Sequence, residues 1–297
     1  MTQWQIWIDR GGTFTDLVAK TPDGNLVTHK LLSENPEKYS DAAVQGIREL
    51  LNIPASASIP ANEIHSVKMG TTVATNALLE RKGDRTLLAI TKGFGDALRI
   101  GYQSRPDLFA RHIKLPEMLY EDVVEIDERF SATGEVIKEL NVEQERFGLQ
   151  NAFNNGIRAI AIVFMHGYRF VAHEKSIAKL AQEIGFTQIS TSHEVSPLMK
   201  LVSRGDTTVV DSYLSPILRR YVDLVANQLN STGEAGPQLM FMQSNGGLTD
   251  AKLFQGKDAI LSGPAGGVVG MVKTCLLYTS PSPRDKIHDL VFRLLLV

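Results

Sequence analysis

The sequence has very little cysteine, almost no net charge and no long apolar run. Its 297 residues include one cysteine, which excludes a disulfide framework and a zinc site built on cysteines. The net charge of −2, without a basic cluster interleaved with aromatic residues, gives no case for a nucleic-acid partner. No stretch approaches the roughly 18 apolar residues of a membrane span, and the N-terminus lacks the basic region of a signal peptide. We therefore expect a cytoplasmic protein with no nucleic-acid and no membrane partner.

Several catalytic and nucleotide-binding motifs are also missing. The sequence contains neither the G-x-x-x-x-G-K-[ST] phosphate loop nor the G-x-S-x-G turn that carries a nucleophilic serine. His166, His173 and His193 do not have a metal-ligand spacing such as H-E-x-x-H, so we interpret them as surface or core residues. The catalytic base stays unassigned.

Residues 8–16, with the sequence IDRGGTFTD, are the most informative segment. Alternating apolar residues before them predict a strand, and two adjacent glycines predict a turn whose backbone N–H groups can approach a phosphate. Threonine hydroxyls can add hydrogen bonds, and carboxylates can hold a hydrated Mg²⁺ beside the phosphate. An ordinary tight hairpin is the alternative that this pattern leaves open. The candidate residues for the phosphate are Asp9, Gly11, Gly12, Thr13, Thr15 and Asp16, and those for the metal, through water, are Asp9 and Asp16.

Two further segments have the composition of ligand-binding turns. Residues 69–80 place Thr71 and Thr72 at the start of a predicted helix, where free N–H groups suit an anion, although a plain N-cap is the commoner role. Residues 262–267 (SGPAGG) predict a glycine-rich turn between a strand and a helix. The glycines would allow either a close approach of a nucleotide or close packing of the helix on the sheet.

The remaining pattern alternates strands and helices, which predicts an α/β architecture with a central sheet. We expect helices over residues 40–51, 73–79, 172–183 and 207–228, the last possibly interrupted at Pro216. We expect buried strands over residues 86–90, 123–126, 159–165, 188–190 and 239–242.

The last 23 residues differ in character from the rest. Residues 275–285 (CLLYTSPSPRD) read as the translation of a transposase-end sequencing adapter, and residues 289–297 resemble the other end of the same adapter. A natural linker does not explain two adapter pieces in the correct order. We therefore expect residues 275–297 to be an artefact that should be excluded from fold reasoning.

The chain resembles the hydantoinase/oxoprolinase family, and within it the ATP-dependent oxoprolinase branch, over residues 4–273. The resemblance is carried by residues 8–16, 30–36 (KLLSENP), 69–83, 119–129, 203–216, 243–248 and 261–270. It implies an α/β fold of the actin-like (ribonuclease-H-like) ATPase type, with ATP and Mg²⁺ as cofactors and a homodimer at full length. The implied reaction opens the small molecule 5-oxo-L-proline to L-glutamate. An ATP-dependent hydantoinase, a related carboxylase subunit and a non-catalytic actin-like nucleotide-binding module are the alternatives.

The resemblance also implies a domain division and further site residues. Residues 1–205 correspond to the family's N-terminal domain with the first phosphate loop, and residues 206–274 to the start of its ATPase domain. Family members carry a second D-x-G-G-T-S-T-D loop that this chain lacks, so we expect a truncated ATPase unit that is inactive as written. The implied nucleotide contacts of the second lobe are Gly263, Gly266 and Gly267, and our candidates for polar groups in the substrate cleft are Arg10, Thr71, Thr72, Asn76 and Asp206.

Overall fold

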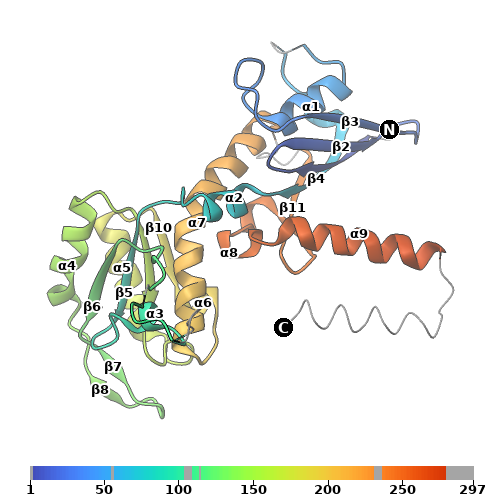
Figure 1. The fold of residues 1–297 in the computed structure, drawn as a ribbon. Helices are drawn as coiled ribbons and strands as arrows, with labels where there is room; N and C mark the ends of the chain where they lie inside the picture. Colours follow the sequence, from blue (N-terminus) through green and yellow to red (C-terminus); the bar gives the residue numbers. More distant parts are fainter. Residues whose placement is uncertain (1–2, 55–56, 104–108, 114, 231–235, 279–297) are drawn as a thin grey trace.

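The computed structural model describes residues 3–54, 57–103, 109–113, 115–230 and 236–278. Its two larger sheets lie on either side of one long helix, α7 (Figure 1). No helix of the described residues is long and apolar enough to cross a membrane. The expected adapter segment lies outside these residues, except for 275–278 at the end of the last helix.

Sheet A has six strands in the order β12-β11-β4-β1-β2-β3. The first three strands form an antiparallel meander, while β4 and β11 run parallel to β1. The 3₁₀ segment η1 precedes β4, and η2 follows β12. The strands are β1 (Trp4–Arg10), β2 (Phe14–Lys20), β3 (Leu26–Leu32), β4 (Ile64–Thr71), β11 (Gln238–Met242) and β12 (Leu248–Asp250), and the 3₁₀ segments are η1 (Ala61–Glu63) and η2 (Ala251–Leu253).

One face of sheet A is buried beneath helices α1 (Ala42–Leu50) and α7 (Leu201–Gln228). The alternation in β1 and β2 directs Ile6, Ile8 and Leu17 into this core. Gly46 lets α1 approach closely, because a Cβ there would lie 2.6 Å from a Leu17 methyl carbon. The residues between them, including Asp9 and Asp16, therefore point to the opposite face.

Sheet B is a parallel sheet in the order β10-β9-β5-β6. Apolar side chains fill both of its faces, as a parallel sheet between helices requires. Helices α4 and α5 cover one face, while α3 and α7 cover the other. The strands are β5 (Thr86–Thr91), β6 (Asp122–Ile126), β9 (Ala159–Val163) and β10 (Gln188–Thr191), and the helices are α3 (Ala97–Ile100), α4 (Val142–Asn154) and α5 (Ala172–Ile184).

A buried polar network ties the carboxyl ends of β9 and β10 to α5 and α7. The Glu174 carboxylate accepts hydrogen bonds from the backbone N–H of Phe164 and from the ring Nδ1 of His193. Arg204, which is fully buried, donates to the Ser192 hydroxyl and to three backbone carbonyls. The ring Nδ1 atoms of His173 and His193 lie 2.7 and 2.6 Å from the carboxylates of Glu128 and Glu174, so of the two predicted positions, surface or core, both residues occupy the core.

Most predicted elements are confirmed within one or two residues. The long helix α7 begins at Leu201, six residues earlier than expected, and continues through Pro216. Helix α4 was not predicted. The expected domain boundary between residues 205 and 206 falls inside α7, and sheet A takes strands from both sides of it.

The prediction for residues 262–267 is wrong in its local structure. No strand precedes this segment; the short helix α8 (Gly256–Ala259) does, and the glycines lie in the first turns of α9 (Ser262–Tyr278). The glycines of this segment have a low helix propensity, but propensity is a weak preference that tertiary packing overrides. Here α9 packs on β4 and β11, and the segment is helical. Helix α9 extends away beyond sheet A (Figure 1).

Candidate phosphate-binding site

The turn between β1 and β2 presents unpaired backbone N–H groups. Gly11 closes the turn by donating its N–H to the carbonyl oxygen of Phe14 at 3.1 Å. A Cβ at Gly11 would lie 2.9 Å from that oxygen, so only glycine fits there. The N–H groups of Gly12 and Thr13 have no acceptor within the described residues. This is the arrangement that a bound phosphate oxygen requires.

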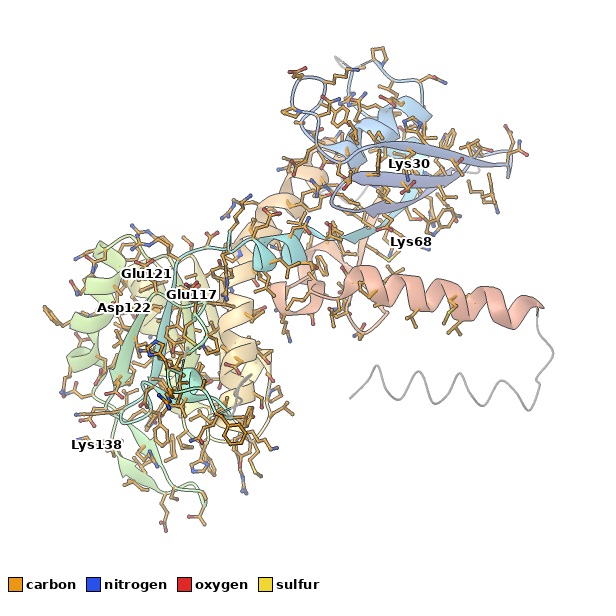
Figure 2. The ribbon with its side chains drawn as sticks, viewed as in Figure 1. Lys30, Lys68, Glu117, Glu121, Asp122 and Lys138 are labelled. Atoms are coloured by element: carbon orange, nitrogen blue, oxygen red, sulfur yellow. The ribbon has the colours of Figure 1, made fainter. Side chains whose placement is uncertain are left out.

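Two carboxylates stand next to this turn in one cross-strand row. The strand register aligns Gly70, Asp9, Asp16 and Lys30 on adjacent strands, all on the face of sheet A that α1 and α7 leave uncovered. The Asp9 carboxylate has no hydrogen-bond or ion-pair partner in the described part of the chain. The Lys30 ammonium lies 2.8 and 3.0 Å from the two carboxylate oxygens of Asp16. Lys30 and Lys68 both lie on sheet A in Figure 2.

The row fits a hydrated Mg²⁺ at Asp9 better than at Asp16. Gly70 has no side chain, and a Cβ there would lie 3.4 Å from Oδ1 of Asp9, so space is left beside the free carboxylate. Mg²⁺ keeps several waters and uses one or two carboxylates together with phosphate oxygens. Asp16 is already paired with Lys30, and the described residues contain no group of three acidic, histidine or cysteine side chains arranged for a metal.

Thr15 lies beneath the turn instead of facing the phosphate space. Its hydroxyl is fully buried and lies 2.9 Å from the Ser33 hydroxyl, which donates to the carbonyl of Gly11 at 2.7 Å. The backbone N–H of Ser33 donates to the carbonyl of Thr13. The Thr13 side chain is exposed. The structure thus gives the two threonines different positions, one supporting the turn and one at its surface.

The start of helix α2 (Val73–Leu79) adds polar groups next to Gly12. Thr72 donates from both its backbone N–H and its hydroxyl to the carbonyl of Arg10. The Asn76 amide donates to the Thr72 hydroxyl at 3.4 Å, and its nitrogen would lie 3.5 Å from a Cβ on Gly12. Thr71 is buried, and its hydroxyl accepts from the N–H of Val73. Gly12, Thr72 and Asn76 therefore come together, whereas Thr71 serves the helix start.

The three candidate glycines of α9 have different surroundings. A Cβ on Gly263 would lie 3.8 Å from the Thr72 methyl carbon, so this residue borders the same group. Gly266 lies against Met242 at the end of β11, and Gly267 has open space around it. Ser262 anchors the helix start by donating to the carbonyl of Thr71 at 2.9 Å.

Arg10 and Asp206 lie away from this group. The Arg10 guanidinium lies on the buried face, 3.7 Å from Asp41 and with its central carbon 5.0 Å from the centre of the Tyr221 ring. Burial of the hydroxyl group, together with the charge of Asp41, raises the pKa of Tyr221 well above its ordinary value. Asp206 lines a separate cavity between the two sheets. The Arg10–Asp41–Tyr221 contact was not predicted, because it depends on three segments that only the fold brings together.

The described architecture and the turn define an α/β protein of the actin-like class. The family model of the hydantoinase/oxoprolinase N-terminal region matches residues 5–185, and the hydantoinase/oxoprolinase model matches residues 204–281. The chain belongs to the hydantoinase/oxoprolinase family, as its sequence motifs predicted.

Several curated relatives are 5-oxoprolinases. Identity to 5-oxoprolinase 1 of Arabidopsis thaliana is 43% over 296 residues, covering 90% of this chain and 23% of the relative. Identity to the 5-oxoprolinase of Dictyostelium discoideum is also 43%, over 299 residues, covering 90% of this chain and 24% of the relative. The chain thus spans about a quarter of the length of these relatives.

Two solved structures share the fold. The nucleotide-free structure of acetone carboxylase superposes with a TM-score of 0.74 at 20% identity, covering 92% of this chain and 40% of that one. The ATP-dependent caprolactamase from Pseudomonas jessenii superposes with a TM-score of 0.75 at 27% identity, covering 93% of this chain and 41% of that one. The predicted actin-like, ribonuclease-H-like fold is confirmed.

Proposed function

We propose that this chain is the part of an ATP-dependent 5-oxoprolinase that holds the triphosphate, in an enzyme that opens 5-oxo-L-proline to L-glutamate. The similarity to curated 5-oxoprolinases supports the reaction, and the β1–β2 turn supports the nucleotide. Because the chain covers about a quarter of those relatives, the activity is proposed for a protein of their length. The homodimer, the cytoplasmic location and the division into residues 1–205, 206–274 and 275–297 rest on the sequence and its family resemblance alone.

One observation supports the proposal most directly: the unpaired backbone N–H groups of Gly12 and Thr13 belong to the turn that follows the unpaired carboxylate of Asp9. Gly12 and Thr13 would donate to phosphate oxygens, and Asp9 would hold Mg²⁺ through a water molecule. Asn76 and Thr72 would border the same phosphate, with Gly263 behind them. Phosphoryl transfer depends mostly on such positioning and on neutralising charge.

The chemistry explains why a lactam hydrolase would use ATP. A five-membered cyclic amide is unreactive towards water, and transfer of the γ-phosphoryl group to its oxygen makes the ring carbon electrophilic. Mg²⁺ and the turn's N–H groups would offset the charge on the group in transfer. Addition of water to that carbon and cleavage of the C–N bond would give an acyl phosphate of glutamate. A second water would then hydrolyse this acyl phosphate to glutamate and phosphate.

The test begins with the gene. The coding sequence beyond Lys273 should be recovered from genomic DNA, which also shows whether residues 275–297 belong to the natural protein. The recovered protein, with Mg²⁺ and ATP, should release glutamate and ADP in equal amounts from 5-oxo-L-proline. Glutamate release without ATP, or none with ATP, would rule out the proposal.

A second candidate is a hydrolase of a different cyclic amide. It is favoured by the 29% identity over 282 residues to the caprolactamase alpha subunit of Pseudomonas jessenii. Turnover of caprolactam or a hydantoin in preference to 5-oxo-L-proline would select it. Nucleotide binding without turnover of any of these compounds would select the non-catalytic actin-like module instead.

A further inference from the structure

A large open groove lies between the two sheets, away from the phosphate-binding turn. It has a volume of about 980 Å³ and is bordered by the end of α2, by α3, by residues that precede β6 and by α7. Apolar side chains form most of its wall, among them Leu78, Leu98 and Val209. Glu117, labelled in Figure 2, also lines it. Small-molecule sites typically have this volume and an apolar wall with a few polar groups, often at the junction of two structural units.

Several polar side chains of the groove have no hydrogen-bond or ion-pair partner within the described residues. Arg99, Tyr120 and Asp206 are three of them, beside Tyr102, Gln103, His112 and Glu117. Burial raises the pKa of Tyr120, and the charges of Arg99 and Asp206 act on the same hydroxyl with opposite sign. Burial also raises the pKa of Asp206. The charges of Arg99 and Asp206 thus both act on this phenol, and the described residues show no ion pair between the two.

We propose that Arg99, Tyr120 and Asp206 form the binding site for a small cyclic amide that bears a carboxylate. This choice of ligand rests on the proposed function. The guanidinium would bind the carboxylate, the Asp206 carboxylate would accept the ring N–H, and the Tyr120 hydroxyl would donate to the ring carbonyl. The ring methylenes would pack on Leu78, Leu98 and Val209. Each hydrogen-bond donor of 5-oxo-L-proline would thereby have an acceptor, and its carbonyl and carboxylate would each have a donor.

Helix α2 connects the turn with the groove. Thr72 at its N-cap and Asn76 at its middle border Gly12, while Leu78 and Leu79 at its C-terminal end line the groove. Thr72 and Leu78 are six residues apart, about 9 Å along the helix axis, so the two sites are separate but adjacent. The groove is larger than a single five-membered ring, and we assign the lactam to the part of it that Arg99, Tyr120 and Asp206 line.

The test is calorimetric titration of the 297-residue chain with 5-oxo-L-proline and with 2-pyrrolidinone, the same ring without the carboxylate. Arg99→Gln should weaken binding of 5-oxo-L-proline by about 10- to 100-fold, as loss of a hydrogen bond to a charged group implies. It should leave 2-pyrrolidinone binding unchanged. Asp206→Asn and Tyr120→Phe should weaken both ligands. Arg146→Gln, at an exposed ion pair on α4, is the matched control and should change neither.

The outcomes separate this inference from the proposed function. Equal affinity of the wild-type chain and Arg99→Gln for 5-oxo-L-proline would overturn the groove site, and so would the absence of binding at millimolar concentration. Glutamate release by the longer protein would still stand in either case. Binding that depends on Arg99, together with no ATP-dependent release, would retain the groove site and remove the proposed reaction. Circular dichroism and the melting temperature verify that each variant is folded.

Discussion

Thr15 and Ser33 form a buried hydrogen bond of 2.9 Å between their hydroxyl groups, directly beneath the turn that joins β1 and β2. Because Ser33 donates onward to the carbonyl of Gly11, Thr15 must be the donor to Ser33. The shape of the turn therefore depends on two side chains that a phosphate would never touch.

Replacing Thr15 by valine tests this support. Valine keeps the shape but removes the donor, which leaves the buried Ser33 oxygen one hydrogen bond short. The free energy of unfolding should fall by about 1–3 kcal/mol, measured by urea denaturation. The exposed Thr13→Val is the control and should change stability by less than about 0.5 kcal/mol. Equal losses in the two variants would show that the buried pair does not hold the turn.

The two turn glycines should respond differently to alanine. Gly11→Ala brings Cβ to 2.9 Å from the Phe14 carbonyl, so the turn must rearrange and stability should fall. Gly12→Ala meets only the Asn76 amide at 3.5 Å, so the fold should persist. Its methyl group would nevertheless occupy phosphate space, and ATP affinity should fall at least about tenfold, or 1.4 kcal/mol. Thermal melting and ATP titration separate the effects; full ATP affinity in Gly12→Ala would exclude this turn as the phosphate site.

The unequal surroundings of Asp9 and Asp16 predict unequal roles with Mg²⁺. Asp9→Asn should remove most of the increase in ATP affinity that Mg²⁺ produces, since its carboxylate is unpaired beside Gly70. Asp16→Asn should have a smaller effect, because that carboxylate already has Lys30 as an ion-pair partner. ATP titrations with Mg²⁺ and with EDTA give the comparison. A larger loss of the Mg²⁺-dependent ATP affinity in Asp16→Asn than in Asp9→Asn would place the metal at Asp16.

Tyr221 offers a prediction of increased stability. Its hydroxyl is buried without a hydrogen-bond partner in the described structure, so the group loses its hydration and gains nothing in return. Tyr221→Phe removes the hydroxyl and keeps the ring beneath Arg10. The free energy of unfolding should rise, or stay within about 0.5 kcal/mol of the wild-type value. A loss of more than about 1 kcal/mol in chemical denaturation would reveal a partner for the hydroxyl.

The sequence predicted the parts of this molecule that depend on local pattern. The alternation of β1 and β2 and the Gly11–Gly12 turn follow from side-chain period and backbone freedom. The family resemblance then supplied the fold. The pattern could not distinguish Thr15 from Thr13, because the direction of each side chain depends on where β2 begins, and that strand starts at Phe14.

The sequence did not predict features that depend on contacts between segments far apart in the chain. Gly70 was not a candidate, yet the register places it beside Asp9. Arg10 was expected in a cleft, but Asp41 and Tyr221, on two different helical segments, accommodate it on the buried face. The burial of Arg204 was not predicted, since its four acceptor atoms lie on three other segments. Long-range pairings of this kind carry no local periodic signal.

Helix α7 connects the groove with the phosphate-binding turn. It carries Asp206 at the groove and Tyr221 under the turn, 15 residues and about 22 Å apart along one continuous rod. Pro216 stands between them, at the point where a proline removes one helical hydrogen bond and makes bending easiest. The two sites thus share one helix as a support, and any effect that a ligand at one site had on binding at the other through α7 would have to be equal in both directions.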